Sequence, residues 1–572
     1  MMQKAFIKKI HVKEYNILFF LSIAIGIVGG LGAVVFRWMI KFNKTLFFDI
    51  ILPHISFYIG DYNIGVIVLP VLGGLIVGPL IYRFAREAKG HGVPEVIEAV
   101  HLKGGIMRPV VAVVKIIVSS VTIGSGGSAG REGPIAQIGA VFGSAVGRFF
   151  CKAKKNVRLM VSCGVAAGIS ATFNAPLGGA VFAMEIISID VGLVSAVPIL
   201  VSAVVGDVVM MAFMDSAPVF ASTPYVFKSA SEIPVFVVFG LVFGVLSAVW
   251  SRTFYKIERT FNGMNFPEQF KPVIGGLLIG LLGVFFLKYG IMGLGYEEIN
   301  MALLGKLSIE VLIVLGAVKI IATSLTIGSG ASGGIFAPSL YIGSMFGAAC
   351  GLLAQHFMPG IITQPFAFAL IGMGALFAGA FRAPMTALIM IPEMTSNYYL
   401  IIPMMIVSAL SYYVASALTK NSMYLIKLEN KGVKVARRES VLEDVMVEDV
   451  MTRDIFYVHP DTSVSDVLEM VMKKRHPGFP VVGRNKRFYG FVKVYDLRGV
   501  ERNQRKDMKV KNIVKPDYPH VFPDDTVYHA LNVMIRHNLG RIPVITEKKG
   551  KLHIAGIISK TDVIKAYEDL TQ

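Results

Sequence analysis

The chain has 572 residues, of which 54% are hydrophobic and only 16% are charged, and its mean hydropathy is +0.63. Soluble globular proteins carry about 25% charged residues, so this composition excludes an ordinary soluble enzyme, a fibrous protein and a disordered protein. The net charge of +18 would suit nucleic acid, but no basic stripe with interleaved aromatic residues occurs, and membrane proteins also collect Lys and Arg at their cytoplasmic face. We therefore expect a lipid bilayer, and no nucleic acid, as the partner.

The predicted elements begin with an apolar run over residues 17–36, after a basic, amphipathic N-terminus. No small-residue cleavage site follows this run, so we expect a retained membrane helix instead of a signal peptide. Later apolar stretches vary in length and are broken by glycine or proline, as over 124–133 and 328–338. Broken backbone at membrane depth is tolerated where it is buried in protein or lines a cavity, so these breaks indicate a solute site.

The apolar part of the chain contains an internal repeat. Residues 114–145 and 318–349 align without a gap at an offset of 204, and 18 of the 32 positions are identical. A second shared element is Phe-X-Ala-Pro with a glutamate nine residues after the proline, and its glutamates are Glu185 and Glu393. Repeats of this kind are a common plan of transporters.

The sequence GREGP at 130–134 has the features of an anion site. Pro134 suits the first turn of a helix, whose free N–H groups and positive dipole end would face the anion. Glu132 is an ionisable group in membrane sequence, which marks a functional site by default. Its carboxylate could occupy the anion site, and the protonated side chain would leave it. The structural alternative is a surface ion pair between Glu132 and Arg131.

Three further segments fit the same pattern. The second half has GGIFAP at 333–338, without an acid, where a helix start could offer the amides of Ile335 and Phe336 to the same anion. A glycine cluster for helix packing is the alternative there. GHGVPE at 90–95 is again glycine-rich before a helix. Tyr424, at the end of the last apolar run, could donate its O–H to an anion or anchor the chain at the membrane interface.

In this order, GHGVPE, GREGP, GGIFAP and the late tyrosine resemble the CLC family of chloride channels and proton-coupled chloride antiporters. The resemblance implies an all-α polytopic membrane protein with two inverted repeats and broken helices. It implies chloride as the substrate and a homodimer with one pore per subunit. It makes Glu132 the gating glutamate. The anion-binding residues that it implies are His91, Gly133, Ile335, Phe336 and Tyr424.

One departure from the family is His91, which stands where the family usually has a serine whose hydroxyl coordinates chloride. An imidazole N–H could replace the hydroxyl donor. Histidine titrates near neutral pH, and a protonated His91 would hold anions more tightly, so we expect anion affinity or conductance to depend on pH. A His91 ring that is turned away and satisfied by backbone groups is the alternative.

A second departure concerns proton transfer. Family antiporters typically have two consecutive acids after the NAPLGG segment, and here Glu185 matches the first acid while Ile186 replaces the second. An isoleucine cannot relay a proton, so the sequence favours passive chloride conduction gated by Glu132. Proton-coupled antiport remains an alternative, because some family members couple protons without that acid, and fluoride exchange is a weaker one. Glu185 has a repeat mate in Glu393, which favours a structural role for both.

Proteins of other classes fit less well. A cation transporter with CBS domains would need acidic residues along its spans, and intramembrane acids are few here. An enzyme would need a nucleophile–base pair, a metal cluster or a phosphate loop, and the sequence contains none of these patterns. The three cysteines lack metal-ligand spacing. We therefore expect neither enzymatic activity nor a metal site.

The composition changes sharply near residue 429. Charged residues number 48 among residues 1–428 and 46 among residues 429–572, so a membrane domain precedes a soluble domain. The membrane domain consists of halves at about 15–215 and 235–428. We expect it in the plasma (cell inner) membrane of a prokaryote.

Valine-rich strands and short amphipathic helices alternate in two parallel units of the soluble domain, at about 446–500 and 510–569. These units resemble a pair of CBS domains, which many CLC proteins carry. The resemblance implies a soluble α/β pair on the cytoplasmic side that regulates the pore.

The second CBS unit resembles the nucleotide-binding pattern of that domain. Ser559 lies three residues before Asp562 at a helix start, where the carboxylate can accept two ribose hydroxyls and the helix can face phosphate. The first unit keeps Asp496 but has Lys493 in place of the Ser or Thr. We therefore expect at most one adenine nucleotide (ATP, ADP or AMP), near Asp562. A purely structural dimer contact is the alternative.

Overall fold

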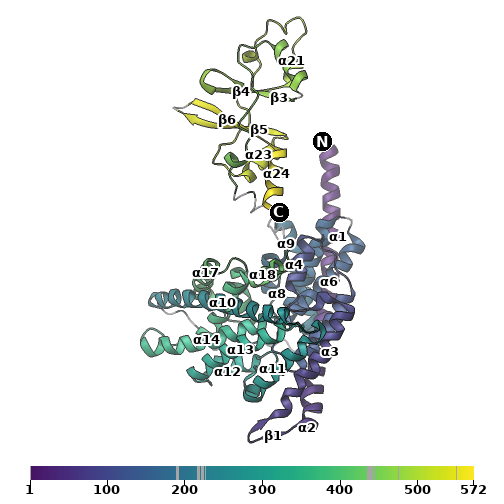
Figure 1. Cartoon of the computed structure of the whole chain (residues 1–572), viewed down its shortest axis with the longest axis vertical. Coiled ribbons are helices and arrows are strands. Elements are labelled where there is room, and N and C mark those ends of the chain that lie inside the picture. The colour runs from purple at the N-terminus through teal and green to yellow at the C-terminus, as the bar shows by residue number, and fades with distance from the viewer. Residues whose placement is uncertain are drawn as a thin grey trace. The chain divides into compact units, whose positions relative to one another are not determined.

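The computed structural model divides into two compact units, unit 1 (Met1–Val435) and unit 2 (Ala436–Gln572) (Figure 1). The residues that the structure describes are 2–151, 153–188, 192–214, 219–220, 225, 227, 229–433, 442, 445–474, 476–548 and 551–571.

In the part of unit 1 that the structure describes, the elements are helical apart from a short antiparallel hairpin, β1 (Tyr58–Ile59) and β2 (Tyr62–Asn63), which the sequence patterns did not predict. The main helices of the first half are α1 (Met2–Lys44), α2 (Leu52–Ile55), α3 (Val68–Phe84), α4 (Val93–His101), α5 (Val110–Gly124), α6 (Glu132–Phe150), α7 (Lys154–Phe173), α8 (Pro176–Phe182) and α9 (Leu193–Phe213). Those of the second half are α10 (Ile233–Gly263), α11 (Lys271–Phe286), α12 (Tyr296–Leu303), α13 (Ile309–Gly328), α14 (Phe336–Phe357), α15 (Ala367–Phe381), α16 (Pro384–Thr395), α17 (Ile401–Leu418) and α18 (Met423–Asn430).

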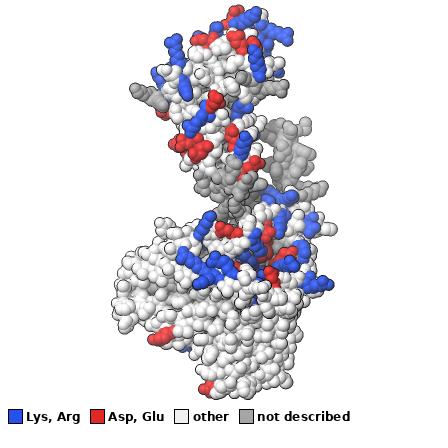
Figure 2. Space-filling view, viewed as in Figure 1, with Lys and Arg blue, Asp and Glu red and all other residues white. Residues whose placement is uncertain are grey.

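Nine helical segments among the described residues are long and apolar enough to cross a membrane, and α5, α8 and α15 belong to shorter apolar segments. Figure 2 shows a broad face of unit 1 without charged side chains, while Lys and Arg gather at one end of this unit. A surface of this kind is expected where lipid covers the apolar face and the charged end lies in water.

The two repeated segments meet where their helices are broken. The breaks between α5 and α6 and between α13 and α14 occupy equivalent places in the two halves. Gly130 N–H donates to the Gly334 carbonyl at 2.8 Å, and Gly334 N–H donates to the Gly130 carbonyl at 2.6 Å. This reciprocal pair satisfies backbone groups that would otherwise be unpaired at membrane depth, and it joins the two halves at their repeat-related positions.

Unit 2 contains two hairpins of the same design. Strands β3 (Gly478–Val482) and β4 (Phe488–Lys493) pair antiparallel, as do β5 (Arg541–Lys548) and β6 (Lys551–Ser559). Each hairpin has one register shift, after Val481 and after Val544, and a further single parallel bridge at each of these residues.

Helices flank both hairpins of unit 2. Its main helices are α20 (Val447–Val450), α21 (Val464–Lys474), α22 (Val494–Arg498), α23 (Val527–Arg536) and α24 (Lys560–Thr571). Side chains cap the starts of two of these helices: Ser463 Oγ accepts from Asp466 N–H before α21, and Thr526 Oγ1 accepts from His529 N–H before α23.

Candidate functional site

The N-terminal ends of three helices, α4, α6 and α14, meet backbone to backbone inside unit 1. Gly90 N–H donates to the Ala331 carbonyl at 3.1 Å, which joins the segment before α4 to the segment before α14. A Cβ at Gly133, in the first turn of α6, would lie 2.1 Å from the His91 carbonyl oxygen and 3.2 Å from the Gly334 Cα. The contacts therefore leave no room for a side chain at Gly133, and three positive helix ends point into one buried region.

His91 lies at this meeting point, directly before Gly92, the N-cap residue of α4. The side chain is 1% exposed, and neither ring nitrogen has a hydrogen-bond partner among the described residues. Its ring centre is 5.6 Å from that of Tyr424 and 6.3 Å from that of Phe254. A buried imidazole without protein partners is costly, so it is suited to a ligand that accepts its N–H.

Tyr424 lies in the first turn of α18, and its side chain is 2% exposed. Its ring packs between His91 and Phe381, whose ring centre is 4.6 Å away. No described residue accepts a hydrogen bond from the Tyr424 hydroxyl, while the neighbouring Met423 carbonyl accepts one from Tyr255. The hydroxyl therefore remains available as a donor to a bound anion.

Glu132 is the first residue of α6 and is 1% exposed. Its Oε2 accepts a hydrogen bond from the Ala337 N–H at 3.2 Å, and its Oε1 accepts one from the Tyr296 hydroxyl at 2.6 Å. Arg131 does not pair with Glu132; its guanidinium donates to the Thr172 carbonyl at 3.1 Å. The carboxylate thus lies on the amide end of α14, where it would compete with an anion for the same donors.

Ile335 and Phe336 form the start of α14 and are almost completely buried. Neither amide N–H donates to a described residue, as expected for the first amides of a helix. The Phe336 ring packs against Phe377 and Phe173, with ring centres 4.6 and 4.9 Å apart. The aromatic contacts fix the start of α14, so its free amides point to a defined place.

Glu185 and Glu393 cap helices in opposite halves. Glu185 accepts from the N–H groups of Met385 and Thr386, at 3.0 and 2.7 Å, at the start of α16. Glu393 accepts from the N–H groups of Leu177 and Gly178, at 3.0 and 2.7 Å, at the start of α8. Each half therefore supplies the acid that caps a helix of the other half.

Ile186 lies beside Glu185 in a π-helical turn, η4 (Ala183–Ile187). Its side chain is half-buried and packs against the apolar core of unit 1. The geometry thus places an apolar group at the position where family antiporters typically have their second acid.

Sequence patterns missed a third repeated element that the structure reveals. Gly293-Leu-Gly-Tyr-Glu-Glu298 precedes and begins α12 as Gly90-His-Gly-Val-Pro-Glu95 precedes and begins α4, at an offset of 203. Gly92 and Gly295 take the same positive φ, 86° and 80°. The one-residue change in offset hides this pair from an ungapped alignment, and with it Tyr296, the residue that contacts Glu132.

Two buried lysines at repeat-related positions hold these glycine segments. Lys115 Nζ donates to the carbonyls of Ala88 and Gly90 at 3.0 and 2.8 Å. Lys319 Nζ donates to the carbonyls of Gly290, Ile291 and Gly293, at 2.8, 3.3 and 3.1 Å. The repeated Val-Lys-Ile-Ile sequence contains both lysines, but their carbonyl partners could not be predicted from it.

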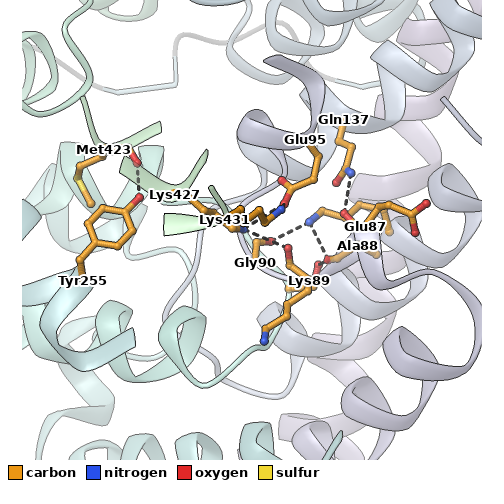
Figure 3. Close-up of polar contacts among 12 residues, drawn as sticks. Glu87, Ala88, Lys89, Gly90, Glu95, Gln137, Tyr255, Met423, Lys427 and Lys431 are labelled. Atoms are coloured by element: carbon orange, nitrogen blue, oxygen red, sulfur yellow. Dashed lines mark hydrogen bonds and ion pairs between the residues drawn. The ribbon is translucent and has the colours of Figure 1, made fainter. Parts of the chain in front are cut away.

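A cationic cluster ties α18 to α4 (Figure 3). The ammonium groups of Lys427 and Lys431 lie 3.3 and 2.9 Å from Glu95 Oε1. Partial burial opposes the charge of Lys431, but Glu95 raises the pKa of this lysine above its ordinary value. Because Tyr424 lies on α18 and His91 directly precedes α4, these ion pairs help to fix the two side chains relative to each other.

The two CBS-like units differ in the contacts of Asp496 and Asp562, each near the start of a helix. Asp562 Oδ2 accepts from the N–H and the hydroxyl of Ser559, at 2.8 and 2.7 Å, and no ion pair to Asp562 occurs among the described residues. Asp496 instead pairs with Lys515 Nζ at 2.8 Å. Burial and the Asp496 charge raise the pKa of nearby Tyr518 to about 12. Only the second unit thus presents its carboxylate without a competing cation.

Among the residues that the structure describes, no group of three or more His, Cys, Asp and Glu side chains is placed to hold a metal ion. The donors at the helix ends are N–H and O–H groups, which bind anions and not cations.

Comparisons with known proteins agree with this geometry. The family model of the voltage gated chloride channel matches residues 73–416, and the CBS domain model matches residues 447–502 and 510–569. The putative chloride channel protein ClcB-like of Ralstonia nicotianae is 31% identical over 362 residues, which cover 63% of this chain and 84% of that protein.

The H(+)/Cl(-) exchange transporter ClcA of Yersinia pestis bv. Antiqua is 33% identical over 381 residues, covering 64% of this chain and 79% of that protein. The structure is similar to the crystal structure of a slow cyanobacterial Cl⁻/H⁺ antiporter, with a TM-score of 0.64 and 27% sequence identity. The match covers 72% of this chain and 97% of the antiporter chain.

Proposed function

The chain belongs to the voltage-gated chloride channel family, and from this premise we propose that it exchanges chloride for protons through a pathway that Glu132 closes. It is a multi-pass membrane protein of an anion-transport family with two CBS domains. The relatives that are named H⁺/Cl⁻ exchangers favour exchange over the passive conduction that the sequence favoured.

The observation that carries this proposal is the position of the Glu132 carboxylate on the Ala337 amide at the start of α14. A carboxylate there uses a donor that an anion would otherwise use, so the ionised side chain excludes chloride. A protonated Glu132 carries no charge, so its attraction to the positive end of the helix is weaker. The ionised carboxylate and chloride therefore compete for one set of donors, so anion entry is linked to protonation of Glu132, and this linkage is the physical basis of the proposed coupling.

Chloride would be held mainly by neutral groups in this proposal. The amides of Gly133, Ile335 and Phe336 supply helix-end N–H donors, while Tyr424 supplies a hydroxyl and His91 an imidazole N–H. Donors without full charge hold an anion firmly enough to strip its water yet release it quickly. The unpartnered ring nitrogens of the buried His91 support this assignment.

A passive channel is the second candidate function, and Ile186 is the observation that favours it. Its side chain packs among apolar groups and offers no proton carrier at that position. Exchange through this chain would need a proton route from the charged end to Glu132 that bypasses Ile186.

The test is chloride flux from liposomes that contain the full-length protein, with external pH recorded and no proton ionophore. We expect a chloride gradient to drive protons uphill at a fixed ratio. Chloride movement with a flat pH trace, when valinomycin balances charge, would contradict exchange and support the channel.

The gating role of Glu132 has its own test in the same assay. Glu132→Gln, which removes the charge with little change in shape, is expected to abolish proton movement and to make chloride flux independent of pH. Asp49→Asn, an exposed acid far along the chain from the helix ends, serves as the control and should behave as the wild type. A pH-dependent flux in Glu132→Gln would exclude Glu132 as the gate.

For the soluble unit we propose an adenine nucleotide site at Ser559 and Asp562. The proposal is supported by a contrast among the described residues: Asp496 forms an ion pair with Lys515, whereas no described Lys or Arg pairs with Asp562. Equilibrium dialysis of ATP, ADP and AMP with the full chain should show at most one site per chain. Asp562→Ala should lose it, and Asp496→Ala should keep it. Equal affinity in both variants would overturn the assignment.

We also propose that the protein is a homodimer with one pore per subunit in the plasma membrane, with the CBS pair in the cytoplasm. The gathering of Lys and Arg at one end of unit 1 supports this orientation (Figure 2). Labelling of Lys551→Cys with an impermeant maleimide tests this orientation. We expect reaction in inside-out vesicles, and reaction in intact cells would show the opposite orientation. Cross-linking in the membrane tests the dimer.

A further inference from the structure

We propose that Tyr296 is a positioning residue that latches the Glu132 carboxylate onto α14 and sets the pH at which the pathway opens. The inference rests on the proposed gating role of Glu132. It assigns a function to the second-half glycine segment, which the sequence motifs did not include.

The latch consists of one hydrogen bond to each carboxylate oxygen. The Tyr296 hydroxyl donates to Glu132 Oε1 at 2.6 Å, and the Ala337 amide donates to Oε2 at 3.2 Å. A carboxylate accepts both bonds at once, whereas a protonated carboxyl group must use one of its oxygens as a donor. The arrangement therefore favours the ionised, blocking state of Glu132.

The Tyr296 ring cannot easily turn away from Glu132. Phe220 packs edge-on against it with ring centres 5.4 Å apart, and the Arg131 guanidinium lies 5.3 Å from its centre. Arg131 is itself held by the Thr172 carbonyl. Two side chains thus fix the ring in the orientation that delivers its hydroxyl to the gate.

The backbone that carries Tyr296 is also fixed. Lys319 binds three carbonyls of the preceding segment, and Gly293 N–H donates to the Gly127 carbonyl at 3.2 Å. Tyr341 donates to the Tyr289 carbonyl at 2.6 Å. A segment with this many anchors holds its first helical residue in a defined position, as a latch requires.

Tyr296 also stands between Glu132 and a cavity of about 380 Å³. Besides Tyr296, this cavity is lined by Lys44, Gly126, Glu297 and Glu298 among others. Figure 1 places α12 away from the end of unit 1 where α4 and α18 lie. Tyr296 thus contacts Glu132 from α12, while Tyr424 belongs to α18, at the other end of unit 1.

Among the residues that the structure describes, the titratable and charged groups that act on Glu132 are Arg131, which precedes it, Tyr296 of α12 and Tyr424 of α18. The backbone donors are the amides of Glu132 itself and of Ala337 in α14. Removal of the Tyr296 hydroxyl leaves the ring contacts and all the other groups unchanged. The loss is one hydrogen bond that favours the ionised carboxylate, so Glu132 should accept a proton at a higher pH.

The experiment compares chloride flux from liposomes as a function of pH for the full-length wild type and Tyr296→Phe. A charge-assisted hydrogen bond of this length is worth roughly a factor of ten, so we expect the flux–pH midpoint to rise by about one pH unit. Tyr225→Phe is the matched control, because it loses a tyrosine hydrogen bond of the same length to the carboxylate of Glu232, which is not part of the latch. Its midpoint should equal that of the wild type.

A third comparison separates failure of the latch from failure of the gate. In the Glu132→Gln background, Tyr296→Phe should cause no further change, because no carboxylate remains to be held. If Glu132→Gln abolishes the pH dependence but Tyr296→Phe has the same midpoint as Tyr225→Phe, the latch is wrong and the gate stands. If Glu132→Gln keeps the pH dependence, the proposed gate itself is wrong.

Discussion

The two halves of the membrane unit share a backbone plan but differ in the side chains that face the anion region. Lys115 recurs as Lys319, and Glu185 recurs as Glu393, and each of these groups binds backbone. The groups that face the meeting helix ends do not recur. Glu132 aligns with Phe336, His91 with Leu294, and Tyr296 with Val93.

This difference separates structural from functional residues without an alignment of homologues. A residue that occurs in both halves in the same contact serves the backbone that both halves need. A buried polar residue that occurs in one half only serves something that the backbone plan shared by the two halves does not require. The three predictions that follow test this division, from the largest expected effect to the smallest.

The largest effect is expected at the repeat-related lysines, and it should be unequal. Lys319→Met leaves the carbonyls of Gly290, Ile291 and Gly293 without any donor among the described residues, so it should destabilise the protein by about 3 kcal/mol or more. Lys115→Met should cost less, because Ser332 still donates to Ala88 and the Gly333 amide still donates to Gly90.

Thermal stability in detergent, followed by the monodisperse fraction after heating, measures this difference. Lys288→Met, which changes a lysine outside these contacts, is the control. If Lys319→Met left stability unchanged but altered the flux–pH curve, this lysine would belong to the functional class and the division would be broken.

The sequence predicted the family, the helical membrane fold and the CBS pair, and the comparisons confirm all three. These predictions succeeded because glycine and proline at helix starts are local signals. A glycine-rich turn followed by proline indicates where a helix begins and in which direction its free amides point. The proposed roles of His91, Glu132 and Tyr424 remain predictions.

Contacts between distant segments could not be predicted in the same way. Tyr296 is 164 residues from Glu132, and its motif shares only two glycines and one glutamate with GHGVPE. The hydrogen bonds that Glu185 and Glu393 make across the repeat were likewise invisible, although the repeat itself indicated that the two acids have one role. Local patterns show which donors and acceptors a segment contains, and only the fold shows which residues they bind.

A smaller effect is expected at the two capping glutamates. Glu185→Ala and Glu393→Ala each remove an acceptor from two amides at a helix start, and each should cost about 1–2 kcal/mol. The same heating assay measures both, with the exposed Asp49→Ala as control. Because both acids are assigned to the backbone, neither variant should change the chloride–proton ratio. A changed ratio in Glu185→Ala at unchanged stability would place this acid on the proton route.

The smallest effect is expected at His91, because its substitution removes a single neutral hydrogen-bond donor. His91→Ala should weaken chloride binding about three- to tenfold in calorimetry, because a single hydrogen bond contributes roughly 0.5–1.5 kcal/mol. His91→Ser should restore part of the affinity through a hydroxyl donor. Leu294→Ala, at the repeat-related position, should leave chloride affinity unchanged.

The pH dependence of these affinities tests the charge of His91. The sequence predicts tighter binding in acid through a protonated ring. Burial and the ammonium groups of Lys427, Lys115 and Lys431 oppose a positive charge on this ring, and Glu95 is the acid that offsets them. We therefore expect the wild type and His91→Ser to gain the same affinity between pH 7.5 and 5.5, because the imidazole binds chloride in its neutral form and the pH response of transport belongs to Glu132. A larger gain in the wild type would show that a protonated His91 contributes.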